Sequence, residues 1–246
     1  MAKIIGEAGA GQKQRSFNHR LKVVKVIFFL TCALCFVSGF VAAKMNIWWA
    51  AALLIILPAY IILKRLLNQH VRLAEDDEKG ASGEKDIARY LEQLPNNYIV
   101  VNDLYFADSY GNIDHLVIGP TGVFAIDVKN WRGTVPTDGK GELLHNGKPT
   151  DKPNIKNFTR RVMDLKERIY ALTRLDPYVQ GVFAFPHTQL EAKWGTTGAV
   201  HCINAENITG YIIKFRPVKQ LLIADIPLIL SATEALKKIE YNMRKK

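Results

Sequence analysis

Two aspartates and a lysine near the middle of the chain have the types and spacing of a site for a divalent cation. Asp127 follows Asp114 in the next apolar run, and Lys129 comes two residues later. Carboxylate oxygens, joined here by the backbone carbonyl of Val128, are ligands that Mg²⁺ or Mn²⁺ prefers. Such a cation polarises a phosphate and lowers the pKa of an attacking water, while an ammonium group offsets the charge that develops. These residues therefore predict metal-dependent phosphodiester hydrolysis.

A β-hairpin is the element that has to position these side chains. Residues 113–118 and 123–129 alternate and are rich in β-branched side chains, and the Gly-Pro-Thr-Gly sequence between them is typical of a turn. Side chains two apart on a strand share a face, so Asp127 and Lys129 are expected to point the same way. The alternative is that these two form only a surface ion pair, worth less than about 1 kcal/mol.

A helix before the hairpin carries a third carboxylate. Ser82 has the character of a helix cap, and the apolar residues that follow repeat at helical spacing. Glu84 precedes Ile87 and Leu91 by three and seven residues, which places it on the inward face, where a carboxylate needs a partner. We expect Glu84 to hold the metal or a metal-bound water. The alternative is that it only stabilises the first helical turn.

The rest of the chain after residue 80 alternates between strand and helix patterns. Strands are expected at residues 98–101, 134–137, 142–145, 178–185 and 199–203, and helices at residues 155–172, at 205–213 and after a capping box at Ser231. This order predicts an α/β sandwich around a mixed sheet.

Two apolar runs precede this part. Residues 26–43 and 47–63 are each about long enough to cross a bilayer as a helix, and Trp48 and Trp49 lie where an interfacial belt is expected. Basic residues flank the pair and only Lys44 lies between the runs, so the positive-inside rule places both termini in the cytoplasm. The prediction is a transmembrane helical hairpin in the cytoplasmic (inner) membrane, with the lipid bilayer as a partner. A cleaved signal peptide ending near residue 43 and a buried soluble hairpin are the alternatives.

Charge and cysteine usage add little to this interpretation. The net charge is +10, but residues 81–246 hold 22 basic and 18 acidic residues, so tight unassisted binding of nucleic acid is not expected from charge alone. Cys32 and Cys35 lie in the first apolar run and Cys202 is alone, which fits a reducing compartment.

Four further residues were weighed as candidates. His187 and Lys193 follow an apolar strand and could line the site. Arg160 and Arg161 lie on the polar side of the expected helix, where a solvated face is the main interpretation and phosphate contact the minor one.

The motifs together resemble a known family. Gly83-Glu84 on the first helix, residues 113–118, and residues 122–130 followed by Gly133 are similar to the NERD (nuclease-related) domain, most densely over residues 80–135 and more loosely to about residue 212. The resemblance implies membership of the PD-(D/E)xK nuclease superfamily, a restriction-endonuclease-like mixed sheet flanked by helices, and DNA cleavage with Mg²⁺. By this resemblance Glu84, Asp114, Asp127 and Lys129 are the catalytic residues.

Two positions depart from the family pattern. Asp127 stands where the family more often has glutamate, and Asn157 or Phe158 falls where a glutamine is common.

The predicted domains are a basic tail (1–25), two transmembrane helices (26–66), a charged linker (67–80), the nuclease-like domain (81–215) and a helical extension (216–246). We expect a membrane-anchored nuclease that acts on DNA at the cytoplasmic face. The alternatives are a non-catalytic scaffold that binds nucleic acid or protein and, more weakly, a membrane assembly protein that only oligomerises.

Overall fold

The structure is a computed structural model of the whole chain, and it describes all residues except 44–48, 106–110, 193–199, 218, 220 and 245–246. The chain divides into two compact units. The sheet unit comprises residues 1–10 and 80–246, and the helical unit comprises residues 11–79. Each unit is described by itself.

A six-stranded mixed sheet forms the centre of the sheet unit, in the order β1-β2-β3-β4-β8-β10. The strands are β1 (Lys3–Ile5), β2 (Ile99–Leu104), β3 (Ile113–Gly119), β4 (Gly122–Val128), β8 (Val179–Phe185) and β10 (Val200–Asn204). Strands β2, β3 and β4 are antiparallel neighbours, whereas the pairs β1–β2, β4–β8 and β8–β10 are parallel.

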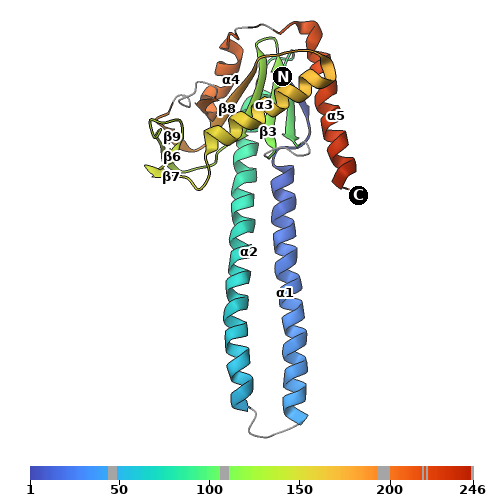
Figure 1. Cartoon of the computed structure of the whole chain (residues 1–246), viewed down its shortest axis with the longest axis vertical. Helices are drawn as coiled ribbons and strands as arrows, with labels where there is room; N and C mark the ends of the chain where they lie inside the picture. The colour runs from blue at the N-terminus through green and yellow to red at the C-terminus, as the bar shows by residue number, and fades with distance from the viewer. Residues whose placement is uncertain (44–48, 106–110, 193–199, 218, 220, 245–246) are drawn as a thin grey trace. The chain divides into compact units, whose positions relative to one another are not determined.

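Helices cover both faces of this sheet. The helices are α2 (Trp49–Glu92), α3 (Asn154–Thr173), α4 (Ala205–Lys214), the 3₁₀ helix η1 (Ile223–Asp225) and α5 (Ile226–Arg244). Apolar side chains of α3 and α5 pack into one core with Leu116 and Ala125, and those of α4 and the end of α2 pack into a second core with Val117 and Phe124. Figure 1 shows α3 crossing the sheet near β3. The predicted mixed sheet flanked by helices is confirmed.

The hairpin that carries the predicted site is buried on both faces. Every residue of β3 is buried, and so is every residue of β4 except its last. Gly119 pairs with Gly122 across the turn, and Gly122 has a φ of +129°, a conformation that favours glycine. The turn sequence thus allows the strands to reverse directly, and it sets the register of the side chains further along.

Two small sheets lie between β4 and the last strand. They are β5 (Gly133–Val135) with β9 (Thr188–Leu190), and β6 (Leu144–His145) with β7 (Lys148–Pro149). In α3, the predicted apolar stripe is buried at Ile155, Phe158, Val162, Leu165 and Ile169, while Leu172 is exposed.

The helical unit begins at Gly11 and contains nearly all of α1 (Ala10–Ala43) and the part of α2 up to Lys79. Polar side chains form contacts between these two helices. Arg20 and Glu78 form an ion pair at 2.6 Å, and the Ser16 hydroxyl donates to the Ala74 carbonyl at 3.1 Å. Nδ1 of His19 lies 3.2 Å from Nδ1 of His70.

These helices overturn the membrane prediction. Over the part of the chain that is described, neither helix presents an apolar length sufficient to cross a bilayer. The predicted transmembrane hairpin, its lipid partner and the location in the inner membrane are therefore wrong. Lys44 and Trp48, which supported that prediction, lie outside the described residues, as does the side chain of Trp49.

Two predicted helix starts also differ. Helix α2 runs without interruption through residues 67–80, so the helix does not begin at Ser82 and the predicted linker is helical. Helix α5 begins at Ile226, and the Ser231 hydroxyl donates to the Pro227 carbonyl within the helix instead of capping it. Ser and Thr hydroxyls can bond to the preceding turn inside a helix, so a capping pattern does not fix a start.

Candidate functional site

The β3–β4 register makes Asp114 and Asp127 direct neighbours. His115 pairs with Ile126, and one step further along the strands Asp114 lies opposite Asp127. Directly opposed residues of an antiparallel pair have Cβ atoms about 5 Å apart. The backbone N–H of Val128 donates to Asp114 Oδ2 at 2.7 Å, and Asn112 Nδ2 donates to Oδ1 at 3.1 Å. Both carboxylates are buried, at 7% and 4% exposed.

Two cations compensate Asp127. Lys129 Nζ lies 2.6 Å from Oδ1, and Arg161 Nη2 lies 2.5 Å from Oδ2. Burial raises the pKa of Asp127, but the charges and hydrogen bonds of Lys129 and Arg161 outweigh burial, so its pKa lies below the ordinary value. The predicted pairing of Asp127 and Lys129 is present, and it is buried rather than on the surface.

Asp114 has the opposite character. Burial, and then the negative charge of Asp127, raise the pKa of Asp114 to about 7, against the Val128 hydrogen bond and the charges of Lys129 and Arg161. One carboxylate of the pair is thus held ionised, while its neighbour takes up a proton near neutral pH. Perturbed pairs of this kind are concentrated at functional sites, although structural networks produce them as well.

Arg161 is the site residue that the sequence interpretation missed. Besides Asp127, its guanidinium donates to the Asn112 carbonyl at 2.6 Å and lies 4.9 Å from the centre of the Phe158 ring. Its side chain is only 11% exposed, so it does not belong to a solvated face, whereas Arg160 is exposed. The available signal was spacing, because Arg161 follows the buried Phe158 by three residues and so shares its side of α3.

Lys129 is fixed from the strand end. Its backbone N–H donates to the Ala184 carbonyl at 2.9 Å, which extends the β4–β8 pairing by one residue. Its ammonium lies 5.1 Å from the centre of the Phe183 ring. These contacts fix the backbone of Lys129, and its ammonium lies between the Phe183 ring and Asp127.

Glu84 is buried, at 2% exposed, on the part of α2 that packs on the other core. Burial lowers the pKa of the His115 ring to about 4, and a hydrogen bond with the backbone of Glu84 partly opposes this shift. Next to Glu84, a Cβ on Gly83 would lie 2.8 Å from Asn130 Cβ, so glycine permits the helix to approach the end of β4. This contact is the physical reason for glycine at position 83.

Glu84, Asp114 and Asp127 are the carboxylates of the predicted metal site. Among the described residues, no three His, Cys, Asp or Glu side chains are grouped so that they could hold a metal ion. The structure brings Asp127 and Lys129 into contact and places Asp114 beside them. Metal binding by Asp114 and Asp127 stays a prediction, with Val128 and Glu84 as further expected donors.

The remaining candidates lie elsewhere or outside the described part. His187 Nε2 pairs with Asp86 Oδ2 at 3.2 Å and lines a cavity with Arg89 and Tyr90, so it contacts neither aspartate of the site. Lys193 is not among the described residues. Cys202 is buried, and burial raises the pKa of its thiol to about 12.

Comparison with known proteins matches part of the sheet unit to a described family. Residues 79–186 match the family model of NERD, the nuclease-related domain, and this stretch contains the β3–β4 hairpin, α3 and all four predicted catalytic residues. This match supports the predicted resemblance to the nuclease-related domain over that stretch. A segment of 86 residues is 36% identical to a protein of Bacillus anthracis described as uncharacterized, over 33% of this chain and 39% of that protein. The chain thus spans about two fifths of the curated relative that it matches. No solved structure matches.

Proposed function

We propose that the sheet unit is a metal-dependent nuclease of the PD-(D/E)xK type, which hydrolyses phosphodiester bonds of nucleic acid, with DNA as the expected substrate. The observation that carries the proposal is the opposed pair Asp114 and Asp127, both buried where β3 and β4 meet α3. Two carboxylates side by side repel each other and repel phosphate. Burying them together is costly unless cations compensate both, and Lys129 and Arg161 pair with Asp127 alone, so a bound metal would compensate Asp114 as well.

The donor set suits a hard cation. Asp114 and Asp127 supply carboxylate oxygens and Val128 a backbone carbonyl, and Mg²⁺ takes oxygen ligands of these kinds. Bound there, the metal would polarise the phosphate and lower the pKa of a water. A site made of only two carboxylates also fits Mg²⁺, which commonly keeps several waters and uses one or two protein carboxylates.

The protein's own residues have distinct roles in this proposal. Asp127 stays ionised because Lys129 and Arg161 hold its pKa down. Lys129, which is 19% exposed, orients the attacking water or offsets charge on the phosphate oxygens. Arg161 is a positioning residue, because it joins Asp127 to the Asn112 carbonyl and so fixes the carboxylate. Glu84 is proposed to act through a metal-bound water.

The test is cleavage by the full chain of linear DNA, circular DNA and RNA, in Mg²⁺, Mn²⁺ or EDTA. We expect cutting that needs the metal and that falls by at least about a hundredfold in Asp127→Asn and Lys129→Met. The matched control is Asp176→Asn, because Asp176 also pairs with a lysine, Lys166, at 2.9 Å but is 54% exposed. Cutting that survives both site variants, or that no metal supports, would refute the proposal.

A second candidate function is a non-catalytic module that binds nucleic acid or protein. The observation that favours it is that both oxygens of Asp127 already contact cations, so no metal is needed to compensate this carboxylate. Under this function, nucleic acid or a protein partner would bind equally well in Mg²⁺ and in EDTA. Asp127→Asn would then alter stability and leave binding of DNA unchanged.

A further inference from the structure

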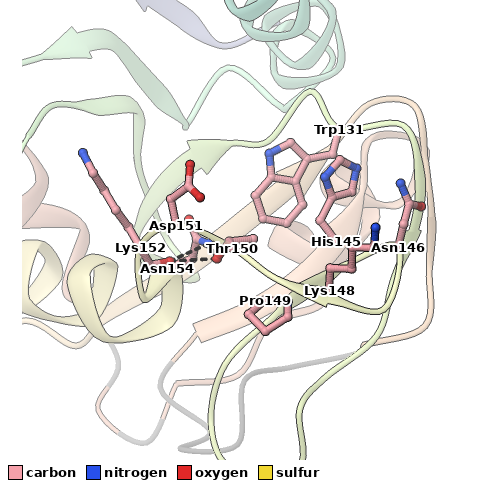
Figure 2. Close-up of a pocket in the computed structure, with 9 residues that line it drawn as sticks. All are labelled: Trp131, His145, Asn146, Lys148, Pro149, Thr150, Asp151, Lys152 and Asn154. Atoms are coloured by element: carbon pink, nitrogen blue, oxygen red, sulfur yellow. Dashed lines mark hydrogen bonds between the residues drawn. The ribbon is translucent and has the colours of Figure 1, made fainter.

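We infer that the cavity beside Trp131 binds an unstacked nucleobase, which would make single-stranded nucleic acid the preferred substrate. This inference rests on the proposed function and names its substrate class. The cavity measures about 590 Å³ and lies where the segment after β4 faces the β6–β7 hairpin and the start of α3 (Figure 2). Ligand cavities typically measure about 300–1,000 Å³, a range that accommodates a nucleotide.

An aromatic wall is the first argument. The rings of Trp131 and His145 stack with their centres 5.1 Å apart and their planes 24° from parallel. Figure 2 shows the imidazole of His145 against the indole of Trp131 at the cavity, so a base would stack on the outer face of this pair. Both residues are half-buried, so part of this wall remains accessible. Bases stack on such surfaces whatever their identity, because every base has a π face.

The wall is held in place before any ligand arrives. The Thr188 hydroxyl donates to the Trp131 carbonyl at 2.6 Å, and the edge of Phe185 supports the indole with ring centres 6.0 Å apart. His145 Nε2 lies 2.8 Å from the Arg132 carbonyl. Because these rings are fixed by tertiary contacts, stacking a base on them would cost little ordering of the protein.

Charged side chains at the cavity suit one nucleotide rather than a neutral ligand. Lys148 and Lys152 are exposed and line the cavity, where they can contact the phosphates on either side of a base. Asp151 also lines it and would repel a phosphate placed beside it, so we place the exocyclic amine of a base there. In a duplex the base faces are covered by their neighbours, and only an unpaired strand offers one to this wall.

The cavity is also connected to the candidate site through the chain. Trp131 follows Lys129 by two residues, and Asn154, which lines the cavity, begins the helix that carries Arg161. Seven residues of helix correspond to about 10 Å along the axis. A strand whose base enters the cavity would therefore have its backbone within a few nucleotides of Asp127.

The test measures binding of the full chain to a fluorescein-labelled oligonucleotide of about twelve adenines and cytosines, whose bases carry exocyclic amines, and to its duplex, by anisotropy in EDTA. We expect the single strand to bind more tightly than the duplex. Trp131→Ala and His145→Ala should each weaken single-strand binding by about tenfold, whereas Trp131→Phe, which keeps a ring, should stay within about twofold.

Tyr170→Ala is the matched control, because Tyr170 is an exposed aromatic residue on α3 that does not line the cavity, and it should bind normally. Circular dichroism shows which variants fold. If Trp131→Ala does not fold, His145→Ala still tests the inference. Equal or tighter duplex binding, or single-strand binding that both folded variants retain, would overturn the inference. Because EDTA stops any cutting, binding is measured independently of cleavage. A chain that never cleaves nucleic acid can therefore still support base binding at the cavity. A chain that cleaves, but whose binding is unaffected by the Trp131 and His145 variants, refutes base binding there.

Discussion

The two units of the chain contain ion pairs of nearly equal length in very different surroundings. In the sheet unit, Arg161 lies 2.5 Å from Asp127, and the two side chains are 11% and 6% exposed. In the helical unit, Arg20 lies 2.6 Å from Glu78, and the two side chains are 60% and 65% exposed. The distances alone would rank the pairs as equals, whereas their exposure to water predicts that they are not.

Water is the reason for the difference. An exposed pair replaces good solvation with a screened attraction and contributes about 0–1 kcal/mol. Members of a buried pair have already lost their solvation, so removing one leaves the other without compensation, at a cost of several kcal/mol. The stability of the sheet unit therefore depends on Asp127 and on both of its partners, Lys129 and Arg161. The helical unit can lose an exposed pair with little change in stability.

The largest expected effect is that of Arg161→Met. This change keeps an apolar stem beside Phe158 but leaves Asp127 paired with Lys129 and without the guanidinium, so we expect a loss of about 3 kcal/mol in the free energy of unfolding. Urea denaturation in EDTA measures it. Arg160→Met is the matched control, since Arg160 is the exposed neighbour on the same helix. A loss below about 1 kcal/mol for Arg161→Met would show that burial does not distinguish the two regions.

The pH dependence of stability should be the next largest effect. Because the pKa of Asp114 rises from 3.8 to about 7 on folding, the folded state binds more protons between these values. The free energy of unfolding should therefore fall as pH rises, by about 2 kcal/mol between pH 5 and 7. Asn at position 114 cannot titrate, so in Asp114→Asn the free energy of unfolding should not fall between pH 5 and 7.

Asp127 should act with the opposite sign and in a more acidic range. Its pKa is lowered on folding, so its contribution is present at neutral pH and is lost as pH falls below about 4. Urea midpoints of the chain and of Asp114→Asn in EDTA from pH 3 to 8 separate the two. Parallel curves for the two proteins would contradict the assignment to Asp114.

A smaller effect is expected where the helix meets the end of β4. Gly83→Ala would place a methyl group against Asn130, at a cost of about 2 kcal/mol, of which up to about 1 is returned because alanine favours the helix. We expect a net loss of about 1 kcal/mol in urea denaturation. Asn130→Gly in the same chain should recover most of it, and failure to do so would place the clash elsewhere.

The smallest effect should be that of Arg20→Met in the helical unit. Its pair with Glu78 is exposed, so the free energy of unfolding should change by no more than about 0.5 kcal/mol. Raising the salt concentration should reduce even that difference, because exposed charges are screened. A loss comparable to that of Arg161→Met would remove the contrast between the units.

The sequence predicted the sheet unit well because its information is local. Alternation along residues 113–129 and the turn between them were enough to place Asp127 and Lys129 on one face, and the structure has both strands as expected. Arg161 was missed because a basic residue on an amphipathic helix resembles a solvated one unless its tertiary partner is known. The opposition of Asp114 to Asp127 required the strand register, which the two-residue turn sets.

The helical unit was predicted less well for a related reason. The apolar composition of residues 26–43 and 47–63 predicts membrane spans, but composition does not show that each run continues into a longer helix whose charged residues pair with the other helix. Likewise, Ser82 has the type of a capping residue, yet α2 continues through it, because a residue type that favours a cap does not by itself end or begin a helix.

The most direct measurement is calorimetric titration of Mn²⁺ into the full chain, with Asp114→Asn, Asp127→Asn and the Asp176→Asn control. The proposed function predicts saturable binding to the chain and to the control, and at least a tenfold loss of affinity in each site variant. Mg²⁺ should compete for the same site. No saturable binding, or affinity that both site variants retain, would contradict the claim that the buried aspartate pair is a metal site and would favour the non-catalytic module.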